Sequence, residues 1–417
     1  MRNPLWWMTN FTWTRRWIGL LALGQTAFFL GLVCIADRYF IDLSNFRWEH
    51  GVALAGLGFI VTYFGFRWGL KGMMETLSPF TPVNVYDFLQ KDITKKRGPR
   101  IVVIGGGTGL SVLLKGLKQY TSKLTAIVTV TDDGGSSGIL RGELGVLPPG
   151  DIRNCLVALA ETENLMDQVF QHRFKEGSVQ GHNLGNLLLT ALTDISGDFV
   201  GAIKQVSQVL AVQGQVLPAT LEQVTLEAIM DDGSIVKGET AITRAGRKIE
   251  KLSLNPSDCR ALPEAVAAIR EADAVIIGPG SLYTSIIANL LVKEIGEAVR
   301  ETRATRIFTV NIMTQPGETT CYTAADHIKT TLGYLGEGTI DYVILNNEVI
   351  DEARLGRYLA DGAQPVQLDH KEILSTGVTP VYAPLLGKDD VAWHEPAELA
   401  RAIMKTIYSR KGLMWVG

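Results

Sequence analysis

Residues 100–138 read RIVVIGGGTGLSVLLKGLKQYTSKLTAIVTVTDDGGSSG, and this stretch decides the fold. Two apolar runs, Ile101–Ile104 and Leu124–Val130, each end in a glycine-rich loop. Between them, Leu110–Tyr120 carries leucines at helical spacing, which predicts a strand, a helix and a second strand. In such a unit both loops lie at the carboxyl edge of a parallel sheet, where these folds bind nucleotides and phosphorylated ligands. We therefore expect the functional site at that edge.

The first loop consists of Gly105, Gly106, Gly107, Thr108 and Gly109. It resembles the dinucleotide-binding turn G-x-G-x-x-G, although Leu110 occupies the place of the third glycine. Glycines let a ligand approach the backbone, and the helix that follows offers unpaired N–H groups to a phosphate. A phosphate or NAD(P) site is one interpretation, and a tight strand-to-helix turn without a ligand is the other. The missing third glycine disfavours a nicotinamide-dependent dehydrogenase.

The second loop places two carboxylates beside flexible and hydroxyl-bearing residues, a combination that contributes nothing to a core. Its candidate site residues are Asp132, Asp133, Gly134, Gly135, Ser136 and Ser137. The acids predict either hydrogen bonds to a ribose diol or coordination of a divalent ion, such as Mg²⁺, that bridges a diphosphate. The serines can donate to a phosphate. A solvated acidic turn is the plain alternative.

The motif GHNLGN at residues 181–186 opens a predicted helix, Leu184–Ile195. Asn183 and Asn186 lie nearly one turn apart, so both amides can face a pocket. Helix capping explains Asn183, but it explains neither Asn186 nor His182. We assign the two asparagines to the candidate site and give His182 no catalytic role, because the sequence identifies no partner for it. The stretch GVLPPGDIR at residues 145–153 is a candidate loop for closing over the site.

Two later strands end in polar and glycine-rich loops. The predicted strand Ala274–Ile277 precedes GPGSLYTS, and the predicted strand Arg306–Ile312 precedes MTQPGET. From these strand ends and loops the candidate binding residues are Gly278, Gly280, Ser281, Tyr283, Asn311 and Thr314. Backbone amides and hydroxyls there suit a phosphate. Tyr283 either stacks on a base or sugar or is an ordinary core tyrosine.

Strands and helices alternate from Arg100 onward, which predicts an α/β fold with a Rossmann-like, largely parallel sheet. A third buried strand is expected at Ile340–Leu345. Residues 215–254 differ, because short alternating runs, one of them Ala241–Arg244, predict a small antiparallel β insertion. We expect the whole domain to span residues 100–417.

The amino-terminal segment, residues 1–75, is predicted to be a hairpin of two transmembrane helices. Trp17–Ala36 carries no charge and is long enough to cross the hydrocarbon core, and Gly51–Phe66 is a second, shorter apolar run. Tryptophans cluster at the ends of both runs, where the membrane interface would lie. A cleaved signal peptide, or one spanning helix followed by a buried segment, is the alternative.

Basic residues set the expected orientation of this hairpin. Arg15 and Arg16 precede the first run, and Arg67 and Lys71 follow the second. The positive-inside rule then places both ends, and the large domain, in the cytoplasm. The protein is thus predicted to be a multi-pass protein of the inner membrane, with residues 76–99 as a linker.

Whole-chain composition excludes some classes of protein. The 417 residues carry a formal net charge of −3, so no basic field exists to hold nucleic acid. The four cysteines are scattered without metal-binding spacing, which suits a reducing cytoplasm.

Several long motifs in series resemble the YvcK-type gluconeogenesis-factor family, a branch of the superfamily that also contains 2-phospho-L-lactate transferase. They read GGGTGLSVLLKGLK, VTVTDDGGSSGILR, PPGDIRNCLVAL, GHNLGNLLLTAL, GPGSLYTSIIANLLV and NIMTQPGETTCYTAADH. A series of this length is far more specific than one glycine loop. The resemblance does not reach the predicted membrane hairpin.

The resemblance implies a regulator that binds a UDP-sugar, typically UDP-N-acetylglucosamine, and links carbon metabolism in gluconeogenic growth to cell-wall precursor synthesis and cell shape. By motif, its ligand site would use Gly106, Gly107, Thr108, Asp132, Asp133, Ser136, Ser137, Asn183, Asn186, Ser281 and Tyr283. The transferase relatives instead use a metal and the acidic loop to transfer a phosphorylated group. The resemblance identifies no catalytic residue, so an enzymatic role stays open. An enzyme of envelope precursor synthesis is the expected partner, and a homo-oligomer is compatible with this role.

Overall fold

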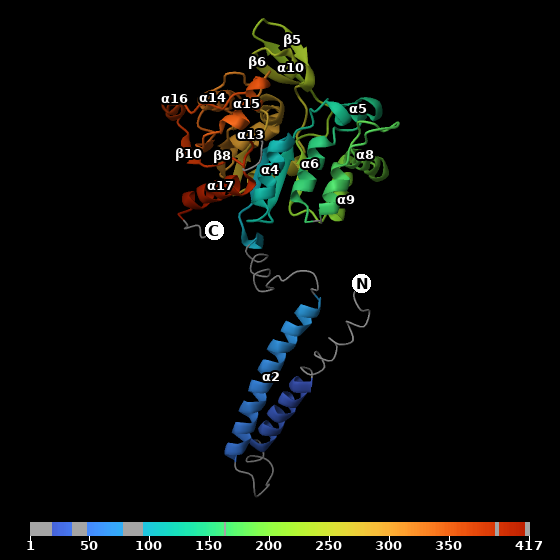
Figure 1. The fold of residues 1–417 in the computed structure, drawn as a ribbon, viewed down its shortest axis with the longest axis vertical. Coiled ribbons are helices and arrows are strands. Elements are labelled where there is room, and N and C mark those ends of the chain that lie inside the picture. Colours follow the sequence, from blue (N-terminus) through green and yellow to red (C-terminus); the bar gives the residue numbers. More distant parts are fainter. Residues whose placement is uncertain (1–18, 36–47, 78–94, 162–163, 388–391, 413–417) are drawn as a thin grey trace. The chain divides into compact units, whose positions relative to one another are not determined.

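In the part of the chain that the structure describes, seven parallel strands form the main sheet, in the order β10-β9-β8-β7-β1-β2-β3 (Figure 1). They are β1 Ile101–Gly105, β2 Leu124–Val128, β3 Gln215–Pro218, β7 Ala274–Ile277, β8 Thr305–Thr309, β9 Tyr342–Asn346 and β10 Thr379–Ala383. Every residue of β1 and β2 is buried, as expected for parallel strands that are covered on both faces. The predicted α/β, Rossmann-like fold is confirmed.

The computed structural model describes residues 19–35, 48–77, 95–161, 164–387 and 392–412. By its internal contacts the chain divides into two units, Met1–Asp92 and Ile93–Gly417. Most of the predicted linker, residues 76–99, lies outside the described residues, and so does most of the segment between the two apolar runs.

Helices pack on both faces of the main sheet (Figure 1). One layer contains α4 Gly107–Leu117, α6 Gly150–Leu159, α9 Phe199–Val209 and α17 Pro396–Arg410. The other contains α11 Pro263–Glu271, α13 Lys293–Glu301 and α14 Ala324–Leu335. Further helices of this unit are α5 Gly135–Leu144, α7 Asn164–Gln171, α8 Leu184–Ser196, α10 Glu239–Ala245, the π-helix η1 Leu282–Ile287, α12 Ala288–Leu290, α15 Glu352–Ala360 and α16 His370–Ser375.

The direction of chain progression across the main sheet reverses at β1. From β1 the chain moves through β2 to β3, and it later returns to β7 on the opposite side of β1. Ile104 pairs in register with Ile127 of β2 and with Ile277 of β7, so these strands end at the same edge. A crevice opens outside the carboxyl ends of the strands at such a reversal, and it is the usual ligand site of doubly wound sheets.

A second, three-stranded sheet stands at one end of this unit (Figure 1). Its strands are β5 Ile235–Lys237, β4 Thr225–Met230 and β6 Ile249–Asn255, and both pairings are antiparallel. The predicted presence of a small antiparallel β insertion is therefore confirmed.

Two details of that insertion were predicted wrongly. Residues Ala241–Arg244 were expected to be a strand, but they belong to helix α10. The helix begins after Gly238, and its first turn is held by the Asp133 carboxylate, which accepts from the Thr240 backbone N–H and hydroxyl. This contact spans a large sequence separation, so the local pattern cannot show it. Residues 215–218 were also placed in the insertion, but they form β3 of the main sheet because Val216 and Leu217 are buried beside β2.

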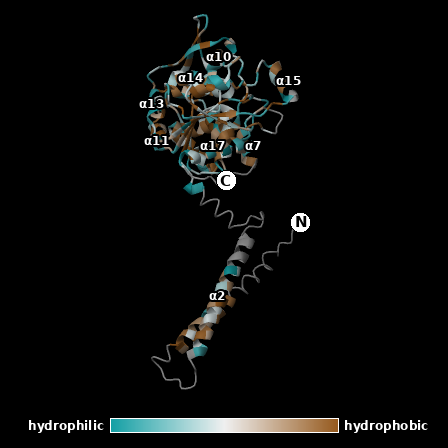
Figure 2. Ribbon diagram, turned by 90° about the vertical axis from the view of Figure 1, so that its left-hand side faces the viewer, coloured by the Kyte–Doolittle hydropathy of each residue, from teal (hydrophilic) through white to brown (hydrophobic). Residues whose placement is uncertain are grey.

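In the first unit, the helix Gly19–Ile35 packs against α2, Trp48–Leu77. A Cβ atom on Gly31 would lie 2.4 Å from the Ala55 backbone nitrogen, and one on Gly58 would lie 2.4 Å from that of Phe28. The helices therefore approach so closely that only glycine fits at these contacts, a packing typical of membrane helices. Leu23 and other large apolar side chains of this unit are exposed, and parts of the α2 ribbon appear brown, the colour of hydrophobic residues, in Figure 2.

Among the described residues, only Glu49–Gly69 is long and apolar enough to cross a membrane, and Gly19–Ile35 is apolar but shorter. The apolar run that contains the shorter helix begins at Trp17, outside the described residues. The two-helix membrane hairpin thus stays a prediction.

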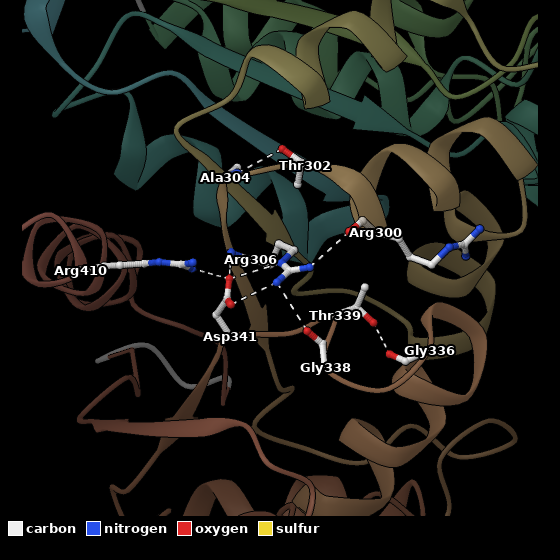
Figure 3. Close-up of polar contacts among 9 residues, drawn as sticks. All are labelled: Arg300, Thr302, Ala304, Arg306, Gly336, Gly338, Thr339, Asp341 and Arg410. Atoms are coloured by element: carbon white, nitrogen blue, oxygen red, sulfur yellow. Dashed lines mark hydrogen bonds and ion pairs between the residues drawn. The ribbon is translucent and has the colours of Figure 1, made fainter.

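An ion-pair network joins the amino ends of β8 and β9 to α17 (Figure 3). Asp341 accepts hydrogen bonds from the backbone N–H and guanidinium of Arg306 and from the Arg410 guanidinium. Burial alone would raise the pKa of Asp341, but these hydrogen bonds outweigh it and lower the pKa. The network lies at the edge of the sheet opposite to the crevice, so its contribution is to stability.

We expect Asp341→Asn to lower the free energy of unfolding by about 2 kcal/mol at pH 7, because hydrogen bonds to an ionised partner are lost. A lowered folded-state pKa stabilises the protein above the unfolded-state pKa, and this contribution disappears as pH falls through the folded value. The difference between variant and wild type should therefore hold from pH 7 to pH 5 and shrink below about pH 4. Chemical denaturation at several pH values measures it.

The matched control is Asp231→Asn, which breaks an exposed pair with Arg247 and should cost less than about 1 kcal/mol. Equal effects of the two substitutions would contradict the stabilising role assigned to Asp341.

Candidate functional site

A cavity of about 460 Å³ opens at the carboxyl ends of β1, β7 and β8, where the strand order reverses. This volume lies within the range of small-molecule sites. Its lining residues are Gly106, Gly107, Thr108, Gly109, Val112, Pro279, Gly280, Ser281, Ser285, Asn311, Ile312, Met313, Thr314, Gln315, Pro316, Tyr358, Asp361, Ala363, Ala392, Trp393 and His394.

The amino end of α4 forms one side of this cavity. Gly106 precedes the helix in an extended conformation, and Gly107 follows with φ of +64°, which favours glycine. No side chain caps this end of the helix. The backbone N–H groups of its first turn, together with the positive end of the helix dipole, therefore favour an anionic ligand.

Two asparagine side chains hold the glycine loops in place. The Asn311 amide accepts from the Gly280 backbone N–H and donates to the Gly280 carbonyl oxygen, at 3.3 and 2.8 Å. The buried Asn289 donates to the carbonyl oxygens of Gly105 and Ser285, at 2.9 and 2.6 Å. The loops after β1 and β7 are thus fixed before any ligand arrives.

Gly109 supplies the close approach that a third motif glycine would give. A Cβ atom there would lie 2.9 Å from the Pro279 carbonyl oxygen and 3.1 Å from the Gly280 nitrogen. Leu110, which stands at the place of that glycine, is instead fully buried in the core. The departure from the dinucleotide pattern therefore leaves the tight contact between the loops intact.

A second polar cluster joins α5, α6 and α8. The Ser136 hydroxyl accepts from the Asn186 side-chain amide at 3.2 Å and lies 3.1 Å from Nδ1 of His182. Asn186 in turn accepts from the Arg153 guanidinium at 2.7 Å. Asn183 caps α8 by accepting from the Gly185 backbone N–H. The predicted loops thus meet, and they hold each other through buried side chains.

Carboxyl groups gather between this cluster and α4. Burial, and then the charge of Asp132, raises the pKa of Asp151 to about 6, although Asp151 accepts a hydrogen bond from the Gly107 backbone. Burial, and then Asp132, raises the pKa of Glu239 to about 9, so Glu239 carries a proton at neutral pH. The charges of Asp132 and Asp151 favour a neighbouring cation, whereas the protonated Glu239 adds none.

The fit of a divalent ion depends on which acids are free to bind it. Among the described residues, no three His, Cys, Asp or Glu side chains are grouped as a metal site. Asp151 accepts a hydrogen bond from the Gly107 backbone at the start of α4 and is repelled by the neighbouring charge of Asp132, whereas Asp133 is engaged with Thr240 of α10. Mg²⁺ commonly binds through one or two carboxylates and the phosphates of a ligand, and Asp132 with Asp151 fits that arrangement.

The structure separates the predicted site residues into groups. Those that line the cavity are Gly106, Gly107, Thr108, Gly109, Gly280, Ser281, Asn311 and Thr314. Those in or next to the second cluster are Asp132, Gly134, Gly135, Ser136, Ser137, Asn183 and Asn186. Gly105 and Gly278 shape the ends of β1 and β7 from outside the cavity lining.

Tyr283 lies apart from both groups. Its side chain is buried, and its hydroxyl lies 2.7 Å from that of Tyr322. Burial, and then the hydrogen bond with Tyr322, raises its pKa. It lines a different groove, of about 1240 Å³, between β6 and α14. Tyr283 therefore has the position of an ordinary core tyrosine and not of a residue that stacks on a ligand in the cavity.

A further wall of the cavity, formed outside α4 and the glycine loops, was missed by sequence reasoning. It comprises Tyr358, Asp361 and Ala363 from α15 and the loop after it, with Ala392, Trp393 and His394 from a segment before α17. Neither segment carries a recognisable motif, and the single signal was one tryptophan in an otherwise unremarkable stretch.

Comparison with known proteins agrees with this architecture. The family model described as 2-phospho-L-lactate transferase CofD matches residues 101–386. A putative gluconeogenesis factor from Nostoc sp. is 48% identical over 352 residues, which cover 84% of this chain and 77% of the relative. The gluconeogenesis factor of Bacillus subtilis is 48% identical over 308 residues, which cover 73% of this chain and 97% of the relative.

A solved structure supports the same assignment. The crystal structure of a UPF0052-family protein from Bacillus halodurans is similar with a TM-score of 0.71 and 48% sequence identity, and the match covers 73% of this chain and 99% of that one. Both the motif resemblance and the fold expected from it are thus confirmed. The chain belongs to the CofD family (UPF0052), among its gluconeogenesis factors.

Proposed function

We propose that the protein is a regulator that binds a sugar nucleotide, with UDP-N-acetylglucosamine as the expected ligand. The observation that carries this proposal is the cavity at the reversal of strand order, with the uncapped amino end of α4 on one side. A diphosphate is the part of a sugar nucleotide that such a helix end binds best. Ser281 and Asn311 line the same cavity and offer further polar contacts.

The regulatory part of the proposal connects ligand supply to envelope synthesis. A UDP-sugar at this site would report the state of carbon metabolism during gluconeogenic growth to an enzyme of cell-wall precursor synthesis, and so affect cell shape. Support comes from the family to which the chain belongs and from a site whose loops are fixed before binding. A fixed site suits recognition because little ordering is needed when the ligand enters.

Isothermal titration calorimetry on the full chain in detergent tests the ligand. We expect saturable heat with UDP-N-acetylglucosamine and much weaker binding of NAD(P) and of a deazaflavin. Thr108→Glu places a carboxylate at the amino end of α4 and should weaken UDP-sugar binding at least tenfold, by repulsion of the diphosphate. The absence of heat with every UDP-sugar would rule out this function.

We also propose that residues 1–75 anchor the protein in the inner membrane, with the large domain in the cytoplasm. The match to the Bacillus subtilis factor covers 97% of that relative but only 73% of this chain. Removal of residues 1–75 should therefore release the protein into the soluble fraction and leave ligand affinity within about twofold. A truncated protein that stays with the membrane, or that cannot fold, would contradict the anchor.

A second candidate function is metal-dependent transfer of a phosphorylated group. The observation that favours it is the pair of Asp132 and Asp151, whose mutual repulsion a divalent ion would offset. Turnover that requires Mg²⁺ and disappears in Asp132→Asn would support it. Ligand binding without turnover, in the presence of Mg²⁺ and candidate acceptors, would argue against it.

A further inference from the structure

The cavity wall that the sequence did not predict contains a small apolar cluster. Ile312, Met313, Ala363 and Ala392 are buried in a cluster separate from the main core, with Tyr358 packed against it. These side chains come from three separate segments, so the wall forms only if the three segments keep their positions relative to one another.

Hydrogen bonds fix those segments against one another. The Thr314 backbone donates to the Gln364 carbonyl oxygen at 2.7 Å, and the Gln364 backbone donates to the Thr314 hydroxyl at 2.9 Å. The Ala392 backbone donates to the Tyr358 hydroxyl at 2.9 Å. Hydrogen bonds therefore join the segments of the wall, which lines the same cavity as the amino end of α4.

Trp393 is exposed within this hydrogen-bonded wall. Its neighbours Ala392 and His394 are 4% and 8% exposed, whereas Trp393 is 52% exposed. Burial lowers the pKa of His394 to about 4, so the imidazole is neutral, and it hydrogen-bonds to the Val310 backbone. Two buried neighbours thus hold a half-exposed indole at the cavity.

We propose that Trp393 and the wall behind it form the subsite for the aromatic base of a nucleoside diphosphate. The proposal rests on the proposed function for the other half of the ligand, the diphosphate at α4. An indole offers a flat apolar face on which a heterocycle stacks, and stacking tolerates different bases because each has a π-face. The polar and apolar sides of one cavity thereby match the charged and aromatic parts of one ligand.

With such a subsite, the two sides of the cavity bind different parts of the ligand. A ligand with phosphates and a base contacts both sides, whereas inorganic pyrophosphate contacts the α4 side alone. Loss of the indole should then weaken the first ligand and leave the second unchanged. A merely structural role for Trp393 would weaken both.

The test is calorimetry of the full chain in detergent with UDP-N-acetylglucosamine, UDP and inorganic pyrophosphate. Trp393→Ala should weaken the two uridine ligands by about tenfold or more, as alanine substitution of a stacking ring does. Trp393→Phe keeps a flat ring and should stay within about threefold. Pyrophosphate affinity and the melting temperature of Trp393→Phe should match the wild type.

Tyr382→Ala is the matched control, because Tyr382 is also an exposed aromatic side chain but does not line this cavity. Unchanged UDP affinity in Trp393→Ala, or equal losses for UDP and pyrophosphate, overturns the subsite while the proposed function survives. If wild type binds no uridine ligand, the proposed function fails, and GDP and NAD⁺ are titrated instead. Binding of either that depends on Trp393 supports the subsite, and binding of neither overturns it.

Discussion

Gly116→Ala should destabilise the large unit by about 3 kcal/mol, because the new methyl group has no room. A Cβ atom at Gly116 would lie 2.0 Å from the Pro396 carbonyl oxygen, at the first residue of α17. Backbone cannot rotate away as a flexible side chain can, so α4 and α17 must separate. The melting temperature should fall by roughly 6–12 °C.

Gly142→Ala is the matched control, because it also replaces a glycine inside a helix. Nothing lies within 4 Å of a Cβ atom at Gly142, on the exposed side of α5. Alanine there should stabilise the protein by about 0.5–1 kcal/mol through its higher helix propensity. Opposite signs for the two substitutions are expected, and a shared sign would contradict the close packing of α4 on α17.

Gly109→Ala should weaken binding of UDP-N-acetylglucosamine by about thirtyfold. The added methyl group would press on the Pro279 carbonyl and the Gly280 nitrogen, so the loops after β1 and β7 must move apart. A shift of this kind displaces the N–H groups that we propose to bind the diphosphate, and small misplacements of such groups have large effects. Calorimetry measures the affinity, and a melting curve measures the accompanying loss of stability.

Lys115→Ala provides the control for this variant. Lys115 lies on the same helix but is exposed near its other end, so its replacement should leave affinity within about twofold. Wild-type affinity in Gly109→Ala would contradict the placement of the diphosphate at α4, whatever the effect on stability.

The main sheet and its loops could be predicted from the sequence because the information is local. β1 and β7 are continuous apolar runs, and glycines mark the point where each strand ends. Chain order and spacing then bring those loops to one edge. The register that joins Ile104 to Ile277 confirms that interpretation.

The features that sequence reasoning missed depend on contacts between distant segments. Helix α10 replaces a predicted strand because Asp133 caps it from far away in the sequence. The backbone next to Trp393 is held by the Tyr358 hydroxyl, which accepts from the Ala392 N–H across 34 residues of sequence. No local pattern records either contact, so the polar side of the cavity was anticipated and the apolar side was not.

The reversal of strand order at β1 has a consequence for synthesis on the ribosome. Arg100, at the start of β1, is bonded to Asp273, at the start of β7, across 173 residues of sequence. At typical elongation rates, β1 emerges about 10 to 35 seconds before its second neighbour exists. During that interval one edge of β1 is open to pairing with a foreign chain. A nascent chain of this protein should therefore need a chaperone most between the release of β1 and the release of β7.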